Sequence, residues 1–360
     1  MNTNGGGGVG EWIGERIAWK EITGFLRRKR VPQHKHSFWY IFGGLTLFFF
    51  IVQIISGILL LFYYSPTPDT ANDSIHLIMT KVPFGWLIRS IHGWSADLMV
   101  AMMLIHLFST FLMRAYRKPR EILWMTGVIQ LFLVLGFAFT GYLLPWDATA
   151  YFATKIGTEI PTSIPFLGPF IVNILRGGDY VGAETLKRLF ALHVVALPII
   201  TLGFVSIHLI LNQVAGTSSP IGVKHTGPGI PFFPNYLYRD GITWTVATMV
   251  LITLVLMLPA DMDPKANPFA SAPPGIHPAW YFLPLFQTLK WFPSQVFGID
   301  GEVIVNVLVG IFGLFLLTVP FLDRKASREV RDRTFTAIGV IAMVYAVVST
   351  VYALKTVGMG

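Results

Sequence analysis

The sequence predicts an all-α, polytopic membrane protein with seven transmembrane helices. The chain has 360 residues, of which 53% are hydrophobic and only 13% are charged. Its longest apolar runs reach the roughly 20 residues that a helix needs to cross a bilayer. Lysine and arginine cluster between some of these runs and are almost absent between others, a pattern typical of multi-pass membrane proteins.

The N-terminal segment, residues 1–36, is expected to lie outside the bilayer. Residues 1–10 form a glycine-rich tail, and residues 11–30 mix apolar side chains such as Trp12 and Leu26 with basic ones. This mixture predicts either an amphipathic helix on the membrane surface or a soluble juxtamembrane helix. The apolar core of a signal peptide is not found before the first span, which we therefore expect to be its own insertion signal.

Seven spans follow, each long enough to cross about 30 Å of hydrocarbon as a helix. They cover roughly residues 37–64, 88–114, 121–145, 187–212, 241–260, 302–322 and 334–355. We expect the chain to divide into residues 37–220, with four spans, and residues 221–360, with three. Two long proline-containing loops, which follow spans three and five, are expected to be functional because of their length.

The distribution of basic residues predicts the orientation of the chain. Lysines and arginines gather before span one, after span two and after span six, which share one face if the spans alternate. The positive-inside rule then places the N-terminus in the cytoplasm, and the C-terminus and both long loops outside. We expect a bacterial plasma membrane protein. The net charge of +8 is explained by this asymmetry, without a nucleic-acid partner.

Four histidines lie inside the apolar spans, where an ionisable side chain is expensive and usually functional. His92 and His106 are 14 residues apart in the second span, and His193 and His208 are 15 apart in the fourth. At about 100° per residue, each pair shares roughly one helix face, and the histidines of the second span are separated by about 21 Å along the axis. Because spans two and four run in the same direction, His92 is level with His193, and His106 with His208.

Two facing imidazoles at each depth are suited to axial ligation of a haem iron. The chain has no cysteine, so histidine is the ligand left for a transition metal, and disulfides, thiolate-bound iron–sulfur clusters and thioether-linked haem are excluded. A transporter whose histidines line a proton path is the alternative interpretation. The pairing by depth favours the metal.

Glycines repeat with the same period in the neighbouring spans. Gly43 and Gly57 are 14 residues apart in span one, and Gly127 and Gly141 are 14 apart in span three. A porphyrin must approach helix backbones closely, and glycine provides that space. Glycines in membrane helices are more often plain packing contacts, but the period that they share with the histidines favours contact with haem.

Several long motifs are similar to those of cytochrome b in the quinol-oxidising cytochrome bc complexes. They are FGWLIRSIH at 84–92, KPRE at 118–121 and TGYLLPWD at 140–147. Residues up to about 220 resemble the four-helix cytochrome b6. Residues from about 230 resemble the three-helix subunit IV, including LLTVPFL at 316–322. The chain therefore resembles a fusion of two polypeptides that are separate in plants and cyanobacteria.

The resemblance implies two noncovalent b haems. His92 and His193 would hold the outward one, and His106 and His208 the inward one. Arg89 would lie near haem propionates, although an anchor at the membrane interface explains it equally well. Members of the family oxidise quinol at an outward site, pass one electron to a Rieske iron–sulfur protein and send the other through the haems to an inward quinone site. The implied partners are a Rieske protein, a c-type cytochrome subunit, membrane lipid and a second copy in a homodimeric complex, so the chain would not be active alone.

The second outward loop carries the quinol-site motif of the family in an altered form. Family members commonly have Pro-Glu-Trp-Tyr, in which the glutamate accepts a proton, but this chain has Ala279 at the acidic position. Since alanine cannot titrate, we expect His277 or Asp147 to accept the proton, and histidine's reference pKa of about 6.5 suits this role. A solvated loop position explains His277 equally well. The other candidate quinol-site residues are Pro278, Trp280 and Tyr281.

Two further positions differ from cytochrome b6, and one acidic residue lies within a span. Cytochrome b6 attaches a third haem through a cysteine that aligns near Ile41, and it has an arginine where this chain has Gln213. A covalently held third haem is therefore excluded. Asp97, the only acid in span two, is either a functional carboxylate or one that water reaches from the outward surface. Among enzymes, the alternative is a di-haem anchor that passes electrons from a dehydrogenase to quinone.

Overall fold

Seven long helices dominate the computed structural model of the chain, which describes residues 9–357 except 17–18, 225, 274 and 331. Residues 1–8, which make up most of the glycine-rich tail, lie outside the described residues. Within the described part, seven helical segments are long and apolar enough to span a membrane, as the sequence predicts. They are Ser37–Leu61, Gly85–Leu112, Glu121–Tyr142, Ala183–Ala215, Phe232–Met257, Gly301–Arg328 and Arg333–Thr356.

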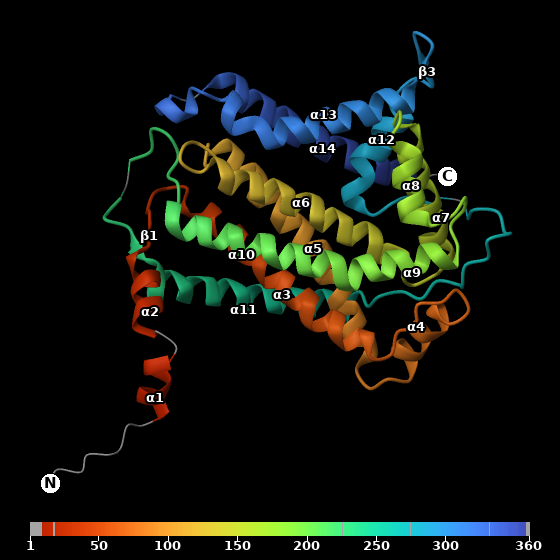
Figure 1. Cartoon of the computed structure of the whole chain (residues 1–360), viewed down its shortest axis with the longest axis horizontal. Coiled ribbons are helices and arrows are strands. Elements are labelled where there is room, and N and C mark those ends of the chain that lie inside the picture. Colours follow the sequence, from red (N-terminus) through yellow and green to blue (C-terminus); the bar gives the residue numbers. More distant parts are fainter. Residues whose placement is uncertain (1–8, 17–18, 225, 274, 331, 358–360) are drawn as a thin grey trace.

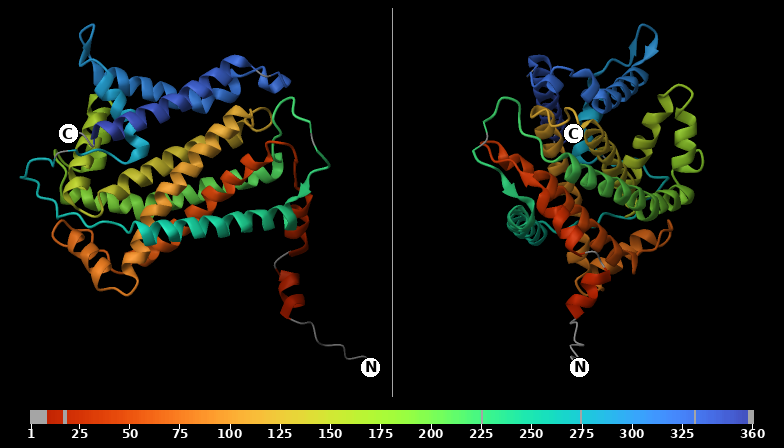
Figure 2. Two further views of the ribbon diagram at one scale, coloured as in Figure 1. Left: turned by 180° about the vertical axis from the view of Figure 1, so that it is seen from behind. Right: turned by 60° about the vertical axis from the view of Figure 1, so that its left-hand side comes forward.

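The regular helices of these segments pack side by side (Figures 1 and 2). Their bounds are α3 (Ile41–Leu61), α5 (Gly85–Leu112), α6 (Glu121–Tyr142), α9 (Ala183–Ala191), α10 (Leu197–Ala215), α11 (Leu237–Met257), α13 (Gly301–Leu322) and α14 (Arg333–Val357). Many large apolar side chains point outward, among them Ile199 on α10 and Met249 on α11. Such helices, apolar on all sides, are typical of a bundle surrounded by lipid.

The core joins the two expected parts of the chain. Helix α3 packs along α5, and α10 packs along α6, while α11 contacts α3 and α5, α13 contacts α6, and α14 contacts α5. Buried side chains of one cluster come from four of these helices, for example Phe49, Met103, Leu131 and Val255. The last three spans are therefore held against the first four by apolar packing.

Both long loops lie at one end of the bundle, which we call the loop end. They contain the shorter helices α7 (Ala148–Glu159), α8 (Gly168–Arg176) and α12 (Leu283–Trp291), and the strands β3 (Gln295–Val296) and β4 (Ile299–Asp300), and α4 (Ala71–Thr80) lies at the same end. Pro169 and Pro284 fall in the first turns of α8 and α12. Proline is tolerated there because the N–H that it lacks would have no intrahelical partner.

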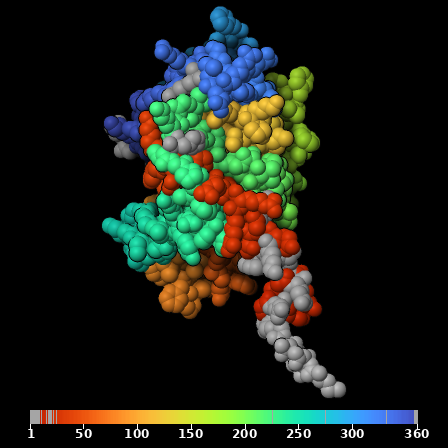
Figure 3. Space-filling model, turned by 90° about the vertical axis from the view of Figure 1, so that its left-hand side faces the viewer, coloured from red at the N-terminus to blue at the C-terminus, as the bar shows by residue number. Residues whose placement is uncertain are grey.

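The opposite end, which we call the basic end, gathers the arginine-rich segments (Figure 3). The helices α1 (Val9–Arg16) and α2 (Trp19–Arg28) precede β1 (Arg30–Val31), which pairs antiparallel with β2 (Ile230–Pro231). The Arg30 guanidinium donates to the carbonyls of Pro228 and Gly229. These bonds fix the segment that links the two parts of the chain.

A buried ion pair also joins the two parts at the basic end. Arg114 follows α5, Asp323 follows α13, and Nε of the arginine lies 2.9 Å from Oδ2 of the carboxylate, with each side chain 1% exposed. The Tyr116 hydroxyl donates to the same oxygen over 2.7 Å. The ion pair and the hydrogen bond partner the carboxylate and offset part of the desolvation that its burial requires.

Candidate functional site

The four histidines of the apolar spans form two pairs, each joining α5 to the fourth span. The ring centres of His92 and His193 are 6.3 Å apart, and the ring planes are tilted by 68°. Two imidazoles on opposite sides of one metal ion have centres about 6 Å apart, because each metal–nitrogen bond is about 2 Å long. His106 and His208 form the second pair and are close enough to interact electrostatically. The first pair lies nearer the loop end and the second nearer the basic end.

These pairs fit a metal ion that brings further ligands of its own. Among the described residues, no group of three or more His, Asp and Glu side chains is placed to hold a bare metal ion. Each of the four histidines is surrounded by the chain and only half-buried as a residue. Two imidazoles at each site suit a porphyrin, which would supply the remaining nitrogens.

Each histidine ring faces one of the four glycines that share its period. A Cβ atom built on the glycine would lie 3.0 Å from Cε1 of the ring for Gly43 and His106, 3.3 Å for Gly57 and His92, 3.3 Å for Gly127 and His208, and 2.6 Å for Gly141 and His193. The sequence suggested that these glycines make room for a porphyrin. In the structure they make room for the imidazoles themselves, so they control where the ring nitrogens lie.

Hydroxyl groups fix the tautomer of the rings. Ser56 Oγ donates to the Val52 carbonyl and lies 2.9 Å from Nδ1 of His92, so it accepts the Nδ1–H of that ring. Thr126 Oγ1 donates to the Leu123 carbonyl and is placed in the same way, 2.9 Å from Nδ1 of His208. A hydrogen on Nδ1 leaves Nε2 with a free lone pair, which is the form that binds a metal.

The other two histidines differ from each other. Nδ1 of His193 lies 3.1 Å from the Phe137 carbonyl, which can only accept, so this ring also carries its hydrogen on Nδ1. Nδ1 of His106 is buried and has no hydrogen-bond partner within the described part of the chain. Thr140 Oγ1 also lies 3.1 Å from Nδ1 of His193. The difference follows from the sequence, because Ser56, Thr126 and Thr140 immediately precede the facing glycines, whereas Phe42 precedes Gly43. This pattern is a signal that could have revealed the hydroxyl partners.

His193 lies in a π-helical turn, Leu192–Ala196, between α9 and α10. Such a turn inserts one extra residue into a helix and is frequent at functional sites. The histidines of the fourth span are 15 residues apart and those of the second are 14 apart. The π turn absorbs the extra residue and keeps His193 level with His92.

Two charged residues near the loop end hold the second long loop. Arg89 donates to the Asp261 carbonyl over 2.7 Å, which is the contact of an anchor. Asp97 accepts a 2.9 Å hydrogen bond from the indole N–H of Trp280. The Asp97 carboxylate is therefore hydrogen-bonded to the loop. The sequence alone did not exclude that water solvates it instead.

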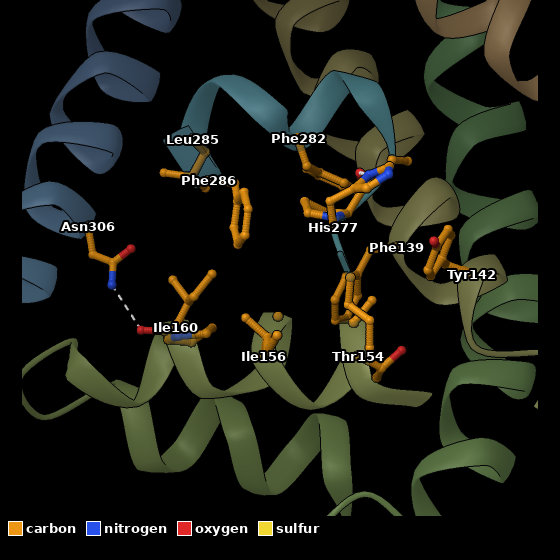
Figure 4. Close-up of a pocket in the computed structure, with 16 residues that line it drawn as sticks. Phe139, Tyr142, Thr154, Ile156, Ile160, His277, Phe282, Leu285, Phe286 and Asn306 are labelled. Carbon is orange, nitrogen blue, oxygen red and sulfur yellow. Dashed lines mark hydrogen bonds between the residues drawn. The ribbon is translucent and has the colours of Figure 1, made fainter. Parts of the chain in front are cut away.

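A cavity of about 270 Å³ opens at the loop end (Figure 4). Its wall, which is mostly apolar, is formed by the end of α6, by α7 and the turn after it, by α12 and the segment before it, and by α13. Polar groups in the wall come from Tyr142, Thr154, His277 and Asn306, and Pro278 and Ala279 also line it. Thr154 Oγ1 is buried without a partner within the described part of the chain. An apolar cavity with a few polar groups is typical of a small-molecule site.

Not every expected quinol-site residue lines this cavity. Trp280 and Tyr281 instead line a second cavity of about 840 Å³, which extends as far as His36 and Pro220 at the basic end. The Asp147 carboxylate caps α7 by accepting the Ala150 N–H over 2.8 Å. Burial raises the pKa of Asp147, an effect that the bond from Ala150 partly opposes.

The comparisons with known proteins cover almost the whole chain. A family model described as Cytochrome b/b6/petB matches residues 27–216, and one described as Cytochrome b(C-terminal)/b6/petD matches residues 265–359. The cytochrome bc complex cytochrome b subunit of Chlorobaculum thiosulfatiphilum is 49% identical over 346 residues, covering 95% of this chain and 80% of that protein. The cytochrome b6 of Stigeoclonium helveticum is 45% identical over 213 residues, covering 59% of this chain and 99% of that protein.

The fold leads to the same relatives. A solved structure of a hyperthermophilic respiratory Complex III superposes with a TM-score of 0.83 at 32% identity, covering 96% of this chain and 91% of that one. The two family models match consecutive parts of one polypeptide, in the order that the sequence motifs suggested. The chain therefore belongs to the cytochrome b/b6 family of cytochrome bc complexes, with a cytochrome b6-like N-terminal part followed by a subunit IV-like C-terminal part.

Proposed function

We propose that the chain is the haem-bearing membrane subunit of a quinol oxidoreductase of the Rieske/cytochrome b type. Proteins of the cytochrome b family bind haem b. The observation that carries the proposal is the matched set of glycine–histidine contacts, which sets two imidazoles against each other at each of two depths. His92 with His193 would hold one haem b noncovalently, and His106 with His208 the other. Held by two histidines, such a haem would supply one-electron transfer rather than oxygen chemistry.

The protein's own part in electron transfer is to hold the rings in place. The Nδ1–H bonds of His92, His193 and His208 keep Nε2 free and orient the imidazole planes. For Arg89, the bond to the Asp261 carbonyl supports anchoring of the loop over contact with a propionate. The two pairs, about 21 Å apart along the helices, would carry an electron across much of the bilayer.

The loop-end cavity is the proposed site of quinol oxidation. Nδ1 of His277 lies 2.9 Å from the Pro278 carbonyl, which can only accept, so the neutral ring carries its hydrogen on Nδ1 and has its lone pair on Nε2. His277 lines the cavity, whereas Asp147 is not among its lining residues and caps a helix. We therefore assign the proton-accepting role to His277. The apolar wall excludes water from the reacting hydroxyl.

The orientation and the partners follow from this assignment. The loop end would face outward and the basic end the cytoplasm of a bacterial plasma membrane, in line with the positive-inside rule. With no cysteine, the chain cannot ligate a Rieske cluster, so the first electron must go to a separate Rieske protein and on to a c-type cytochrome. The complex is proposed to be homodimeric and to release quinol protons outside. Membership of the cytochrome b/b6 family leaves the dehydrogenase-anchor and transporter alternatives without support.

Single-histidine variants test haem ligation. His193→Leu is expected to lower the haem content from two per chain to about one, because it removes one of two axial ligands at a single site. His76→Leu, which changes an exposed histidine on α4, is the control and should retain both haems. Pyridine haemochrome quantitation gives the haem content. If His193→Leu kept two haems per chain, the assignment of His193 would be wrong.

A second pair of variants tests the proton acceptor. His277→Ala should slow quinol oxidation in the assembled complex by roughly 100-fold and flatten its pH profile, because the acceptor is lost. Asp147→Asn keeps an oxygen to cap α7 and should leave both unchanged. If Asp147→Asn slowed quinol oxidation and His277→Ala did not, Asp147 would be the proton acceptor.

A further inference from the structure

Asn306 lines the loop-end cavity from α13, and its amide has a fixed orientation. Nδ2 donates to the Ile160 carbonyl over 2.9 Å and to Ser163 Oγ over 2.6 Å, both in the turn that follows α7. Because the Ile160 carbonyl can only accept, the amide atom facing it must be the nitrogen. Both N–H groups of Asn306 are thereby used, and they clamp the turn against α13.

This orientation turns the amide oxygen of Asn306 away from the turn. Figure 4 shows the oxygen on the side of Phe286, with the nitrogen bonded to Ile160. Within the described part of the chain, Nδ2 is the atom of this side chain that forms hydrogen bonds. Oδ1 is therefore available as an acceptor in a cavity whose wall is mostly apolar.

Besides the hydroxyl groups of Tyr142 and Thr154, the cavity thus has an amide and an imidazole acceptor in different parts of its wall. Asn306 and His277 lie on different sides of the space in Figure 4 and come from α13 and from the segment before α12. A quinol carries two hydroxyl donors at opposite ends of its ring. Two acceptors on different sides match that pattern, because each hydroxyl can donate to one of them.

We propose that Asn306 binds one quinol hydroxyl through Oδ1 while His277 accepts the other, so that Asn306 determines the position of the head group and the preference for quinol over quinone. This inference rests on the proposed quinol oxidation at the cavity. Oxidation would send one electron to the separate Rieske protein together with the proton of the hydroxyl at Asn306, whose amide is too weakly basic to keep it. The other electron would go to the haem held by His92 and His193, and the other proton to His277. Both hydroxyls thereby become carbonyls, which are acceptors only. The quinone would therefore set a carbonyl against Oδ1, and the lost bond favours release of the product.

The test uses the assembled complex containing the full chain, with two variants. Asn306→Leu removes the acceptor and the clamp at nearly constant volume. Ser163→Ala removes one clamping bond but leaves Oδ1 and the bond to Ile160 intact, so it is the matched control. A short-chain naphthoquinol and a short-chain benzoquinol serve as substrates, each with its monomethyl ether as a competitive inhibitor that has a single hydroxyl.

For the quinol that the wild type oxidises, Asn306→Leu should raise KM roughly three- to tenfold, the equivalent of one hydrogen bond. Ser163→Ala should change KM by less than about twofold, because the acceptor remains. The inhibition constant of the ether should also change by less than about twofold in Asn306→Leu, since its one hydroxyl can still donate to His277. An unchanged KM in Asn306→Leu, an equal rise in Ser163→Ala, or an equal rise in the ether's inhibition constant would each overturn the proposal.

A measurement on the wild type covers the case in which Asn306→Leu does not assemble. With the complex kept fully reduced, quinol is not oxidised, and calorimetry gives its dissociation constant and that of the ether. The quinol should bind roughly three- to tenfold more tightly, and equal constants would overturn the proposal. If the wild-type complex oxidised neither quinol, the proposed function itself would fail, whereas normal oxidation with an unaffected Asn306→Leu variant would refute only the role of Asn306.

Discussion

Replacing Gly141 with alanine should remove the haem of the His92–His193 site. The new Cβ atom would lie 2.6 Å from Cε1 and 3.1 Å from Nδ1 of His193. Because carbon atoms pack at about 3.5 Å or more, the imidazole would have to move by about 1 Å. A free side chain can make such a shift, but a ring held by a metal–nitrogen bond of about 2 Å cannot.

The size of the effect follows from this overlap. Overpacking of a tight site costs about 1–3 kcal/mol, which corresponds to a roughly 5- to 150-fold weaker affinity for haem. The hydrogen bond between His193 Nδ1 and the Phe137 carbonyl would also be disturbed. Purified Gly141→Ala protein should therefore contain closer to one haem than two, and the remaining haem should keep its wild-type potential.

The assay is pyridine haemochrome quantitation with a redox titration of the purified chain. Gly136→Ala is the control on the same helix, because its Cβ would meet only Leu197 at an ordinary 3.7 Å. Gly127→Ala, with 3.3 Å to His208, should have a milder effect than Gly141→Ala. Two haems with wild-type potentials in Gly141→Ala would show that the His193 ring moves freely, and ligation through that ring would be refuted.

Three further predictions concern the rest of the chain. Arg114→Met leaves the buried Asp323 carboxylate without its charged partner and should lower the free energy of unfolding by about 3–5 kcal/mol. If unfolding in detergent showed a loss of less than about 1 kcal/mol, the two residues would not form a buried charge pair. Phe42→Thr should give Nδ1 of His106 a hydrogen-bond acceptor. The midpoint potential of the haem held by His106 should then fall by about 40 mV, the equivalent of about 1 kcal/mol. An unchanged or higher potential in a redox titration would contradict this prediction. Burial lowers the pKa of Lys29 to about 8 from 10.5, so between these pH values the unfolded state binds more protons than the folded state, and the stability should rise from pH 8 to 10.5. The melting temperatures of the wild type and Lys29→Met should then converge as the pH rises. A constant difference between the two melting temperatures would contradict this prediction.

The spans could be predicted from the sequence because hydrocarbon thickness sets their length. The seven expected segments all occur as helices, and their ends differ by at most four residues except at the start of the fifth and at the end of the sixth, which extends to Arg328. The fifth segment begins at Phe232 rather than near residue 241, since a short stretch, Phe232–Tyr236, precedes α11 and is kinked at Phe233, whose backbone is extended (φ −106°, ψ 130°). The short helices of the long loops could not be predicted by hydrophobic length. Two of them, α8 and α12, have a proline in the first turn.

The histidine and glycine positions could be predicted because both repeats follow the helix period. The π turn at His193 had only one signal, the spacing of 15 residues instead of 14. Asn306 was missed because its partner Ile160 is 146 residues away, a pairing that no local pattern encodes. Its signal was the single amide in the apolar span 302–322. Arg114 and Asp323 were missed for the same reason, as two basic-end residues far apart in the chain.

Haem quantitation on the purified wild-type chain, combined with a dithionite-reduced minus oxidised spectrum and a redox titration, tests the central claim most directly. Two histidine pairs at different depths predict two noncovalent b haems per polypeptide with separate midpoint potentials. A single haem per chain would show that one of the pairs does not ligate iron. A folded preparation that binds no haem would contradict the account, because the glycine–histidine contacts would then serve helix packing alone.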